Sequence, residues 1–215
     1  MQISVQGEQR VRVAPERADL SLAASQEGTD RAKVVADVTA AANEIGRELE
    51  AFKAAGVVER YSVQAMRTYA WKKGPHSPER ITASVDITAR FVDFEALGGY
   101  TAEAAARTGV RLGWVNWALT DATADRLRDE CIAGAVARAR QRAEAMARAA
   151  GAGAIEITEV ADPGMLGMPE PRQLFDGGPR MMAMAARGAA EPEPVAVVPQ
   201  EIEIGAQLQL RFVTV

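Results

Sequence analysis

The first 24 residues alternate between apolar and polar side chains in two successive stretches. A period of two predicts strands that bury one face and expose the other. Pro15 separates the stretches and suits a turn, because it fixes φ and has no N–H for a strand ladder. We therefore expect residues 2–24 to form a long antiparallel hairpin with one apolar face. The apolar or small positions are Ile3, Val5, Gly7, Val11 and Val13, then Ala18, Leu20, Leu22 and Ala24.

Three segments carry apolar side chains at intervals of three and four, which is typical of amphipathic helices. They predict helices over residues 30–55, 93–108 and 121–150. Gly56, Gly109 and Gly151 stand where a glycine commonly ends a helix. The apolar stripe of the third helix is rich in alanine, so we expect that helix to approach its sheet closely.

Further alternating segments predict the remaining strands. Residues 60–71 and 81–91 flank a Gly/Pro-rich turn and predict a second hairpin, and residues 154–161 and 202–212 predict two more strands. Residues 110–119 are apolar on both parities. A strand that is covered on both faces, or one that meets a partner chain, has this pattern.

Residues 163–199 differ from the rest of the chain, because they hold most of the prolines and five methionines and show no sustained period. A connection this long leaves two interpretations open: a flexible insert without a partner, or a functional segment.

The order of predicted elements is ββαββαβαββ. Strands that arrive mostly as hairpins, and helices with one apolar stripe each, predict the α+β class: an antiparallel-rich sheet with three helices packed on it. Residues 19–119 follow the βαββαβ order of a ferredoxin-like unit. We expect one domain over residues 1–215, with the insert at 163–199.

Composition limits the classes of function. The chain has 215 residues, 48% of them hydrophobic, and a net charge of −4, which gives no electrostatic basis for binding nucleic acid. Without a run of about 20 apolar residues we expect no membrane span. Cys131 is the only cysteine, so no intrachain disulfide can form. No export signal opens the sequence, and we expect a cytoplasmic protein.

Several segments together resemble a known family. They are the opening Ile3-Ser4-Val5-Gln6-Gly7-Glu8, the following Val11 to Ala18, the Ala/Arg-rich helix from Arg128 to Ala147, the Met/Pro-rich insert and the closing Val198-Pro199-Gln200-Glu201-Ile202. In order and spacing they resemble the SIMPL domain, a family of unknown function that includes bacterial periplasmic immunogenic proteins and a mammalian kinase-associated signalling protein.

The resemblance implies an α+β fold and a tendency to self-assemble, and it implies no enzymatic activity and no catalytic residues. Many bacterial members are exported, whereas this sequence opens without a signal. The resemblance and the predicted architecture both depend on the paired strands of residues 2–24.

No residue pattern predicts a catalytic centre, a cofactor site or a metal site. His76 lies in a Gly/Pro turn, where it is either an exposed turn residue or the base for one Ser or Asp. Cys131 lies on the apolar stripe of a predicted helix, where it is either a small buried hydrophobic residue or a reactive thiol. Asp121, Asp125 and Asp129 recur at i, i+4 spacing near a helix start, where the helix dipole explains at least the first of them without a metal.

The remaining candidates are aromatic and methionine side chains. Tryptophan and tyrosine are enriched at interfaces and in ligand pockets, and flexible thioethers adapt to varied apolar surfaces. We expect a non-catalytic module that self-associates and presents residues 163–199 to a neighbouring subunit or another protein. The alternative is a small-molecule carrier or an unrecognised hydrolase with a Trp-lined pocket. The candidate interaction residues are Trp114, Trp117, Met165, Met168, Met181, Met182 and Met184.

Overall fold

The computed structural model describes residues 1–166 and 198–215. Its α+β class, its antiparallel sheets and all three predicted helices agree with the sequence analysis. The elements are β1 (Gln2–Val13), β2 (Arg17–Gly28), α1 (Arg31–Ala54), β3 (Val58–Val63), β4 (Arg67–Trp71), β5 (Arg80–Phe91), α2 (Phe94–Ala105), β6 (Val110–Ala118), α3 (Asp121–Ala149), β7 (Ile155–Ala161) and β8 (Ile202–Thr214).

The strands divide between two sheets, so the prediction of one common sheet is wrong. A three-stranded sheet has the order β1-β8-β7, and a five-stranded sheet has the order β3-β5-β2-β6 with β4 also paired to β5. Each sheet belongs to its own compact unit. We call residues 1–13, 121–166 and 203–215 the terminal unit, and residues 14–120 and 198–202 the central unit.

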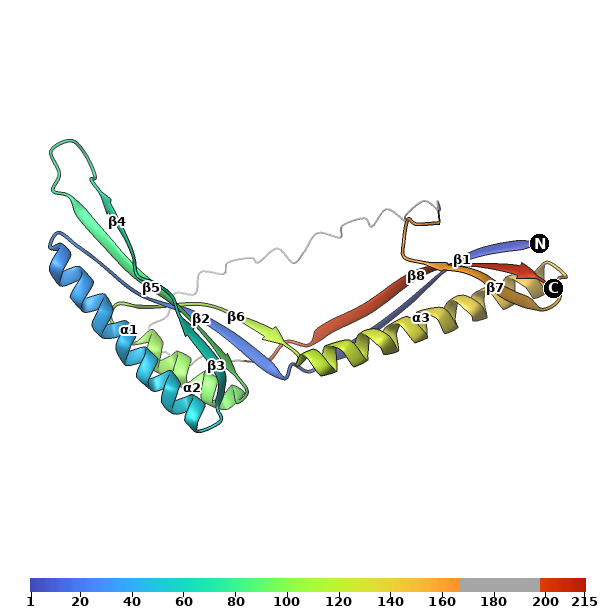
Figure 1. Cartoon of the computed structure of the whole chain (residues 1–215), viewed down its shortest axis with the longest axis horizontal. Helices are drawn as coiled ribbons and strands as arrows, with labels where there is room; N and C mark the ends of the chain where they lie inside the picture. The colour runs from blue at the N-terminus through green and yellow to red at the C-terminus, as the bar shows by residue number, and fades with distance from the viewer. Residues whose placement is uncertain (167–197) are drawn as a thin grey trace, which may run out of the picture. The chain divides into compact units, whose positions relative to one another are not determined.

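The central unit contains the predicted ferredoxin-like arrangement. β2 pairs antiparallel with β5 on one side and with β6 on the other, and β3 lies outside β5. The helices α1 and α2 connect strands that are not neighbours, which is the split βαβ connection of this fold. Both helices cover the same face of the sheet (Figure 1). The other face is left to polar side chains.

The core of the central unit is built from large side chains. Leu20 and Leu22 of β2 and Ile87 of β5 are buried beneath Ile45 and Leu49 of α1. The rings of Phe52, Phe91 and Tyr100 meet at centroid distances of 5.6 to 6.2 Å. Tilted and edge-on ring pairs of this kind stabilise a core beyond the area they bury.

Helix caps confirm two predicted helix starts. The Asp30 carboxylate accepts a hydrogen bond from the backbone N–H of Lys33, at 3.1 Å. The Asp93 carboxylate accepts two, from Glu95 and Ala96, both at 3.0 Å. Each carboxylate thereby satisfies N–H groups that have no partner within the helix.

The terminal unit packs α3 on the sheet through small side chains. Ala135, Ala139, Ala143 and Ala147 are buried against Ile3 and Val5 of β1 and Leu208, Leu210 and Phe212 of β8. Gly7 makes this approach possible, because a Cβ there would lie 2.0 Å from the carbonyl oxygen of Ala135. The expected close approach of the alanine stripe is confirmed.

The predicted hairpin of residues 2–24 is wrong. Its two strands exist, but β1 pairs with β8 and β2 pairs with β5 and β6. A strand has two edges, and both edges of β2 are occupied, so β2 has none left for β1. Alternation identifies the buried face of a strand but not its neighbour.

The second predicted hairpin is present with one change. Residues 60–71 were expected to form one strand, whereas the structure has two, β3 and β4, separated at residues 64–66. Both pair antiparallel with β5. Among the described residues, no helix is long and apolar enough to cross a membrane.

Candidate functional site

The predicted interaction residues lie in different places. Trp114 on β6 is 73% exposed, and Met165 after β7 is 76% exposed. Trp117 instead packs onto the central core, with its ring 5.1 Å from that of Phe94 in an edge-on arrangement. The other four candidates, Met168, Met181, Met182 and Met184, lie outside the described residues.

A β-bulge explains why β6 is apolar on both parities. The register between β2 and β6 shifts between Leu20 and Leu22, which pair with Val115 and Leu112. The extra residue in β6 changes the parity, so that side chains on both sides of the bulge reach the same core. The side chains that share this core are Val110, Leu112, Val115 and Trp117. Trp114 lies within the bulge and stays in solvent.

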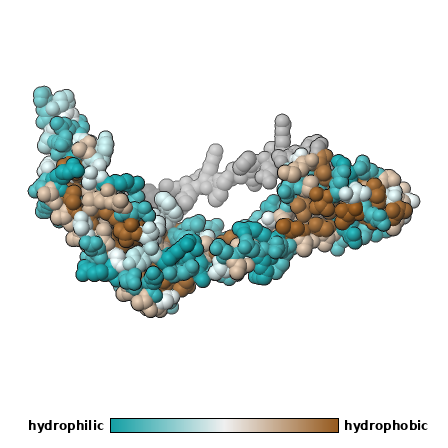
Figure 2. Space-filling view, viewed as in Figure 1, coloured by the Kyte–Doolittle hydropathy of each residue, from teal (hydrophilic) through white to brown (hydrophobic). Residues whose placement is uncertain are grey.

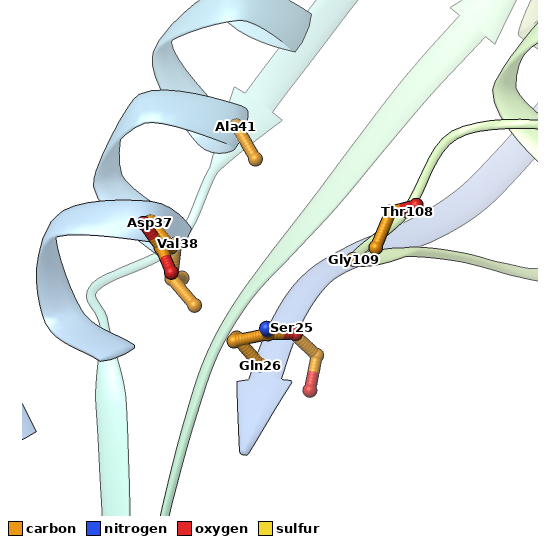
Figure 3. Close-up of a pocket in the computed structure, with 7 residues that line it drawn as sticks. All are labelled: Ser25, Gln26, Asp37, Val38, Ala41, Thr108 and Gly109. Atoms are coloured by element: carbon orange, nitrogen blue, oxygen red, sulfur yellow. The ribbon is translucent and has the colours of Figure 1, made fainter. Parts of the chain in front are cut away.

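No tryptophan lines the four hollows found in the described part of the chain. Figure 3 shows one of them, a cavity of about 180 Å³ between α1, β2 and the start of β6. Its polar groups serve the fold: the Ser25 hydroxyl accepts a hydrogen bond from Arg111 at 2.7 Å, and its N–H donates to the carbonyl of Gly109. The hypothesis of a Trp-lined pocket gains no support from these hollows.

The residues considered for chemistry are dispersed. His76 lies in an exposed turn between β4 and β5. Cys131 is buried on α3, with Sγ 3.5 Å from the carbonyl oxygen of Ile204. Among the described residues, no three His, Cys, Asp or Glu side chains come together in a way that could hold a metal ion.

The face of the central sheet opposite its helices carries paired charges. Arg90 on β5 donates two hydrogen bonds to Asp19 on β2, at 2.7 and 2.8 Å. Arg67 pairs with Asp86, and Arg80 with Glu27, across neighbouring strands. Cross-strand pairs of opposite charge stabilise a sheet modestly. This face is therefore a polar surface whose charges largely neutralise one another.

Tyr100 has an unusual environment on α2. Burial raises the pKa of its hydroxyl to about 12, helped by the nearby Glu48 carboxylate. Its hydroxyl has no hydrogen-bond partner among the described residues. Arg107 donates to both oxygens of Glu48 at 2.7 Å, so that carboxylate is already engaged. The phenol stays protonated at neutral pH and acts as core packing.

Of the four sheet edges formed by the described residues, three are protected against further pairing. β6 carries the bulge at Trp114, and β7 has a bulge between Ile157 and Glu159 as well as two glutamates. β3 and β4, on the same side of β5, are only 6 and 5 residues long. Bulges, charges and short strands are the usual means by which proteins prevent edge-to-edge pairing.

The fourth edge belongs to β1, which pairs with β8 on one side only within the described residues. The carbonyl of Met1 accepts from the N–H of Thr214 at 3.0 Å. Backbone groups of odd-numbered residues therefore point to β8, and those of even-numbered residues point to the free edge. Residues Gln2 to Gly7 carry no charged side chain and no proline, and their burial alternates regularly at Ile3, Val5 and Gly7.

Sequence reasoning missed this edge, because the predicted hairpin gave β1 a partner in β2. The sequence nevertheless contained a signal for this edge. The segment Gln2-Ile3-Ser4-Val5-Gln6 reads nearly the same in both directions from Ser4.

Comparison with sequence families gives one match. The family model described as SIMPL, protein of unknown function (DUF541), matches residues 3–212. Comparison with curated proteins gave no match. The matched range spans both compact units, so the family's sequence signature comprises the two together. This chain belongs to the SIMPL family.

Proposed function

We propose that this chain is a non-catalytic interaction module that assembles with further copies of itself. The observation that carries the proposal is the unprotected edge of β1, since β1 is a strand at the edge of its sheet and is paired on one side only within the described residues. Such strands present rows of unpaired N–H and C=O groups, which are the template for adding another strand.

Exposed apolar side chains support the same function. The terminal unit exposes Ile132, Met146 and Val160, and the face seen in Figure 2 carries a continuous apolar stretch over this unit. The central unit exposes Trp114 on its β6 edge. Tryptophan is enriched among the residues that contribute most to protein interfaces.

Sedimentation or light scattering of the whole chain tests self-association. We expect a species of at least twice the chain mass of 22.9 kDa at a concentration of tens of micromolar. A strict monomer over this range would contradict the proposal.

The methionine-rich insert is tested separately. Deleting residues 165–196 is expected to weaken assembly or partner binding, because it removes Met165, Met168, Met181, Met182 and Met184. A variant that keeps the length of the insert and replaces these five methionines by glutamine is the matched control for their apolar character. Unchanged assembly in both variants would make the insert a passive connection.

A further inference from the structure

Along the free edge of β1, side chains already bond the outward backbone groups in one half but not in the other. We call these the closed half and the open half. At the closed half, the carbonyl of Glu8 accepts from Arg138 of α3 at 3.2 Å, and the carbonyl of Arg10 accepts from the Gln9 amide at 3.4 Å. At the open half, no side chain of the described residues bonds the outward groups of Gln2, Ser4 and Gln6. This half is the regular, uncharged segment of the edge.

The open half is self-complementary. When two copies run antiparallel with Ser4 opposite Ser4, Gln2 of each copy faces Gln6 of the other. On the opposite face Ile3 meets Val5, which extends the apolar layer already covered by α3. Residues of even number carry the outward backbone groups, so this register forms hydrogen-bonded pairs. It also ends at Gly7, before the carbonyl that Arg138 occupies.

The Gln6 side chain lies on the face of β1 away from α3 and is half-buried. Its amide nitrogen Nε2 is buried and has no hydrogen-bond partner among the described residues. A buried unsatisfied amide costs about 1–3 kcal/mol. In the register set by the hydrogen bond between Met1 and Thr214, Gln6 lies opposite Gln209 of β8. Gln209 on β8 is buried too, but its side-chain oxygen is already bonded by the N–H of Gly164.

The flank of α3 beside the edge carries both basic and apolar side chains. Arg138 reaches the free edge, so positions four and eight residues further on, Arg142 and Met146, lie on the same flank. Met146 is 46% exposed. Met146 therefore adds one exposed apolar side chain to this flank.

We propose that two copies of the chain join through β1, in antiparallel register about Ser4, to form one continuous six-stranded sheet from the two terminal units. This pairing rests on the proposed self-association and names the surface that performs it. The occupant is a second copy because the side chains match those of the same segment read in reverse.

A charge placed at the centre of the pairing tests the surface. Ser4 is exposed, and its side chain lies on the face away from α3, so Ser4→Lys leaves the core intact. Two facing lysines repel each other, and we expect the dissociation constant to rise about tenfold or more, with partial recovery at high salt. Ser4→Thr is the conservative control. Trp114→Lys puts the same charge on the β6 edge and tests that edge as the competing surface. Tyr69→Lys, at an exposed position of β4, is the matched charge control and should leave assembly unchanged.

A cysteine cross-link tests the register. In a Cys131→Ala background, Ser4→Cys places two sulfurs on residues whose Cα atoms lie about 5.5 Å apart, within reach of a disulfide. Mild oxidation should yield a covalent dimer. Gln2→Cys is the matched control. In this register Gln2 faces Gln6 of the other copy, so the two cysteines lie four residues apart along the strand and should not form a disulfide.

The outcomes separate the two proposals. Loss of assembly in Ser4→Lys together with the Ser4→Cys cross-link supports the β1 pairing. An assembled wild type with no effect at Ser4, or with loss only in Trp114→Lys, overturns the β1 pairing and leaves self-association standing. A monomeric wild type removes both.

Discussion

The two units of this chain pack helices on sheets in opposite ways. In the central unit large side chains fill the space, with Phe52, Phe91 and Tyr100 in ring contact. In the terminal unit alanines of α3 lie against β1, and Gly7 brings the helix backbone next to the strand. Both solutions obey the same alternation of apolar and polar positions. Their difference teaches that the pattern selects the buried face, whereas side-chain size sets the distance between layers.

The two kinds of packing predict opposite sensitivities. A core of large side chains is damaged by making them smaller, because a cavity remains. A seam of small side chains is damaged by making them larger, because nothing can move aside without shifting the backbone. The predictions that follow run from the largest expected effect to the smallest.

Truncating the aromatic cluster should have the largest effect. Phe91→Ala removes a fully buried ring, and we expect the free energy of unfolding to fall by about 3–5 kcal/mol. Denaturant unfolding followed by circular dichroism measures it. Tyr69→Ala removes an exposed ring from the same sheet and is expected to change stability by less than about 0.5 kcal/mol. Equal effects of the two would contradict the central core described above.

Enlarging the seam should have the next largest effect. Gly7→Ala adds a Cβ at 2.0 Å from the Ala135 carbonyl oxygen, so α3 must shift, at a cost of about 1–3 kcal/mol. Gly46→Ala on α1 is the matched control, because no atom lies within 4 Å of its new Cβ. There alanine should stabilise the helix by up to about 1 kcal/mol. A neutral Gly7→Ala in the same unfolding assay would show that the seam is loose.

Removing a helix cap should have a smaller effect. Asp93→Ala leaves the N–H groups of Glu95 and Ala96 without their acceptor, and we expect a loss of about 1 kcal/mol. Asp93→Ser retains a capping oxygen and should recover most of this loss. If the serine variant is as unstable as the alanine variant, the cap is not the cause.

The smallest effect is a dependence on pH. Hydrogen bonding to Arg12, at 3.0 Å, lowers the pKa of the Glu203 carboxyl below its usual 4.5. A carboxylate with a lowered folded pKa adds stability above its unfolded pKa and loses it as the pH falls through the folded value. Glu203→Gln should therefore lower stability slightly at pH 7 and flatten its decline in acid.

Urea midpoints at pH 7, 4.5 and 3 measure this dependence. Glu201→Gln, for which the described residues offer no ion pair, is the control and should follow the wild type. An unchanged acid slope in Glu203→Gln would contradict the assignment.

The sequence predicted faces, helix ends and fold class better than strand neighbours. Periodicity located α1, α2 and α3, and Asp30 and Asp93 cap the first two of these helices. It failed for the pairing of β1, because β8 lies nearly 200 residues away and nothing local distinguishes it from β2 as a partner. The family match is confirmed although the predicted hairpin is wrong. The residues that carried the resemblance identify the strands and helices along the chain, and they do not determine which strands pair.

The candidate site was predicted in part, for a similar reason. The two-sided pattern of residues 110–119 marked β6 as unusual. A bulge, which periodicity does not encode, decides that Trp114 is exposed and that Trp117 is partly buried against the core. The open edge of β1 was hidden by the wrong hairpin. An edge is a property of sheet order, and sheet order depends on contacts that are distant in sequence.

Hydrogen exchange of the β1 amides, resolved by residue at two protein concentrations, tests the central claim most directly. The N–H groups of Ile3 and Val5 point to β8 and should exchange slowly at both concentrations. Those of Ser4 and Gln6 point to the free edge and should become slow only at the concentration where the chain assembles. Exchange at Ser4 and Gln6 that does not change with concentration would contradict the pairing of two copies through β1.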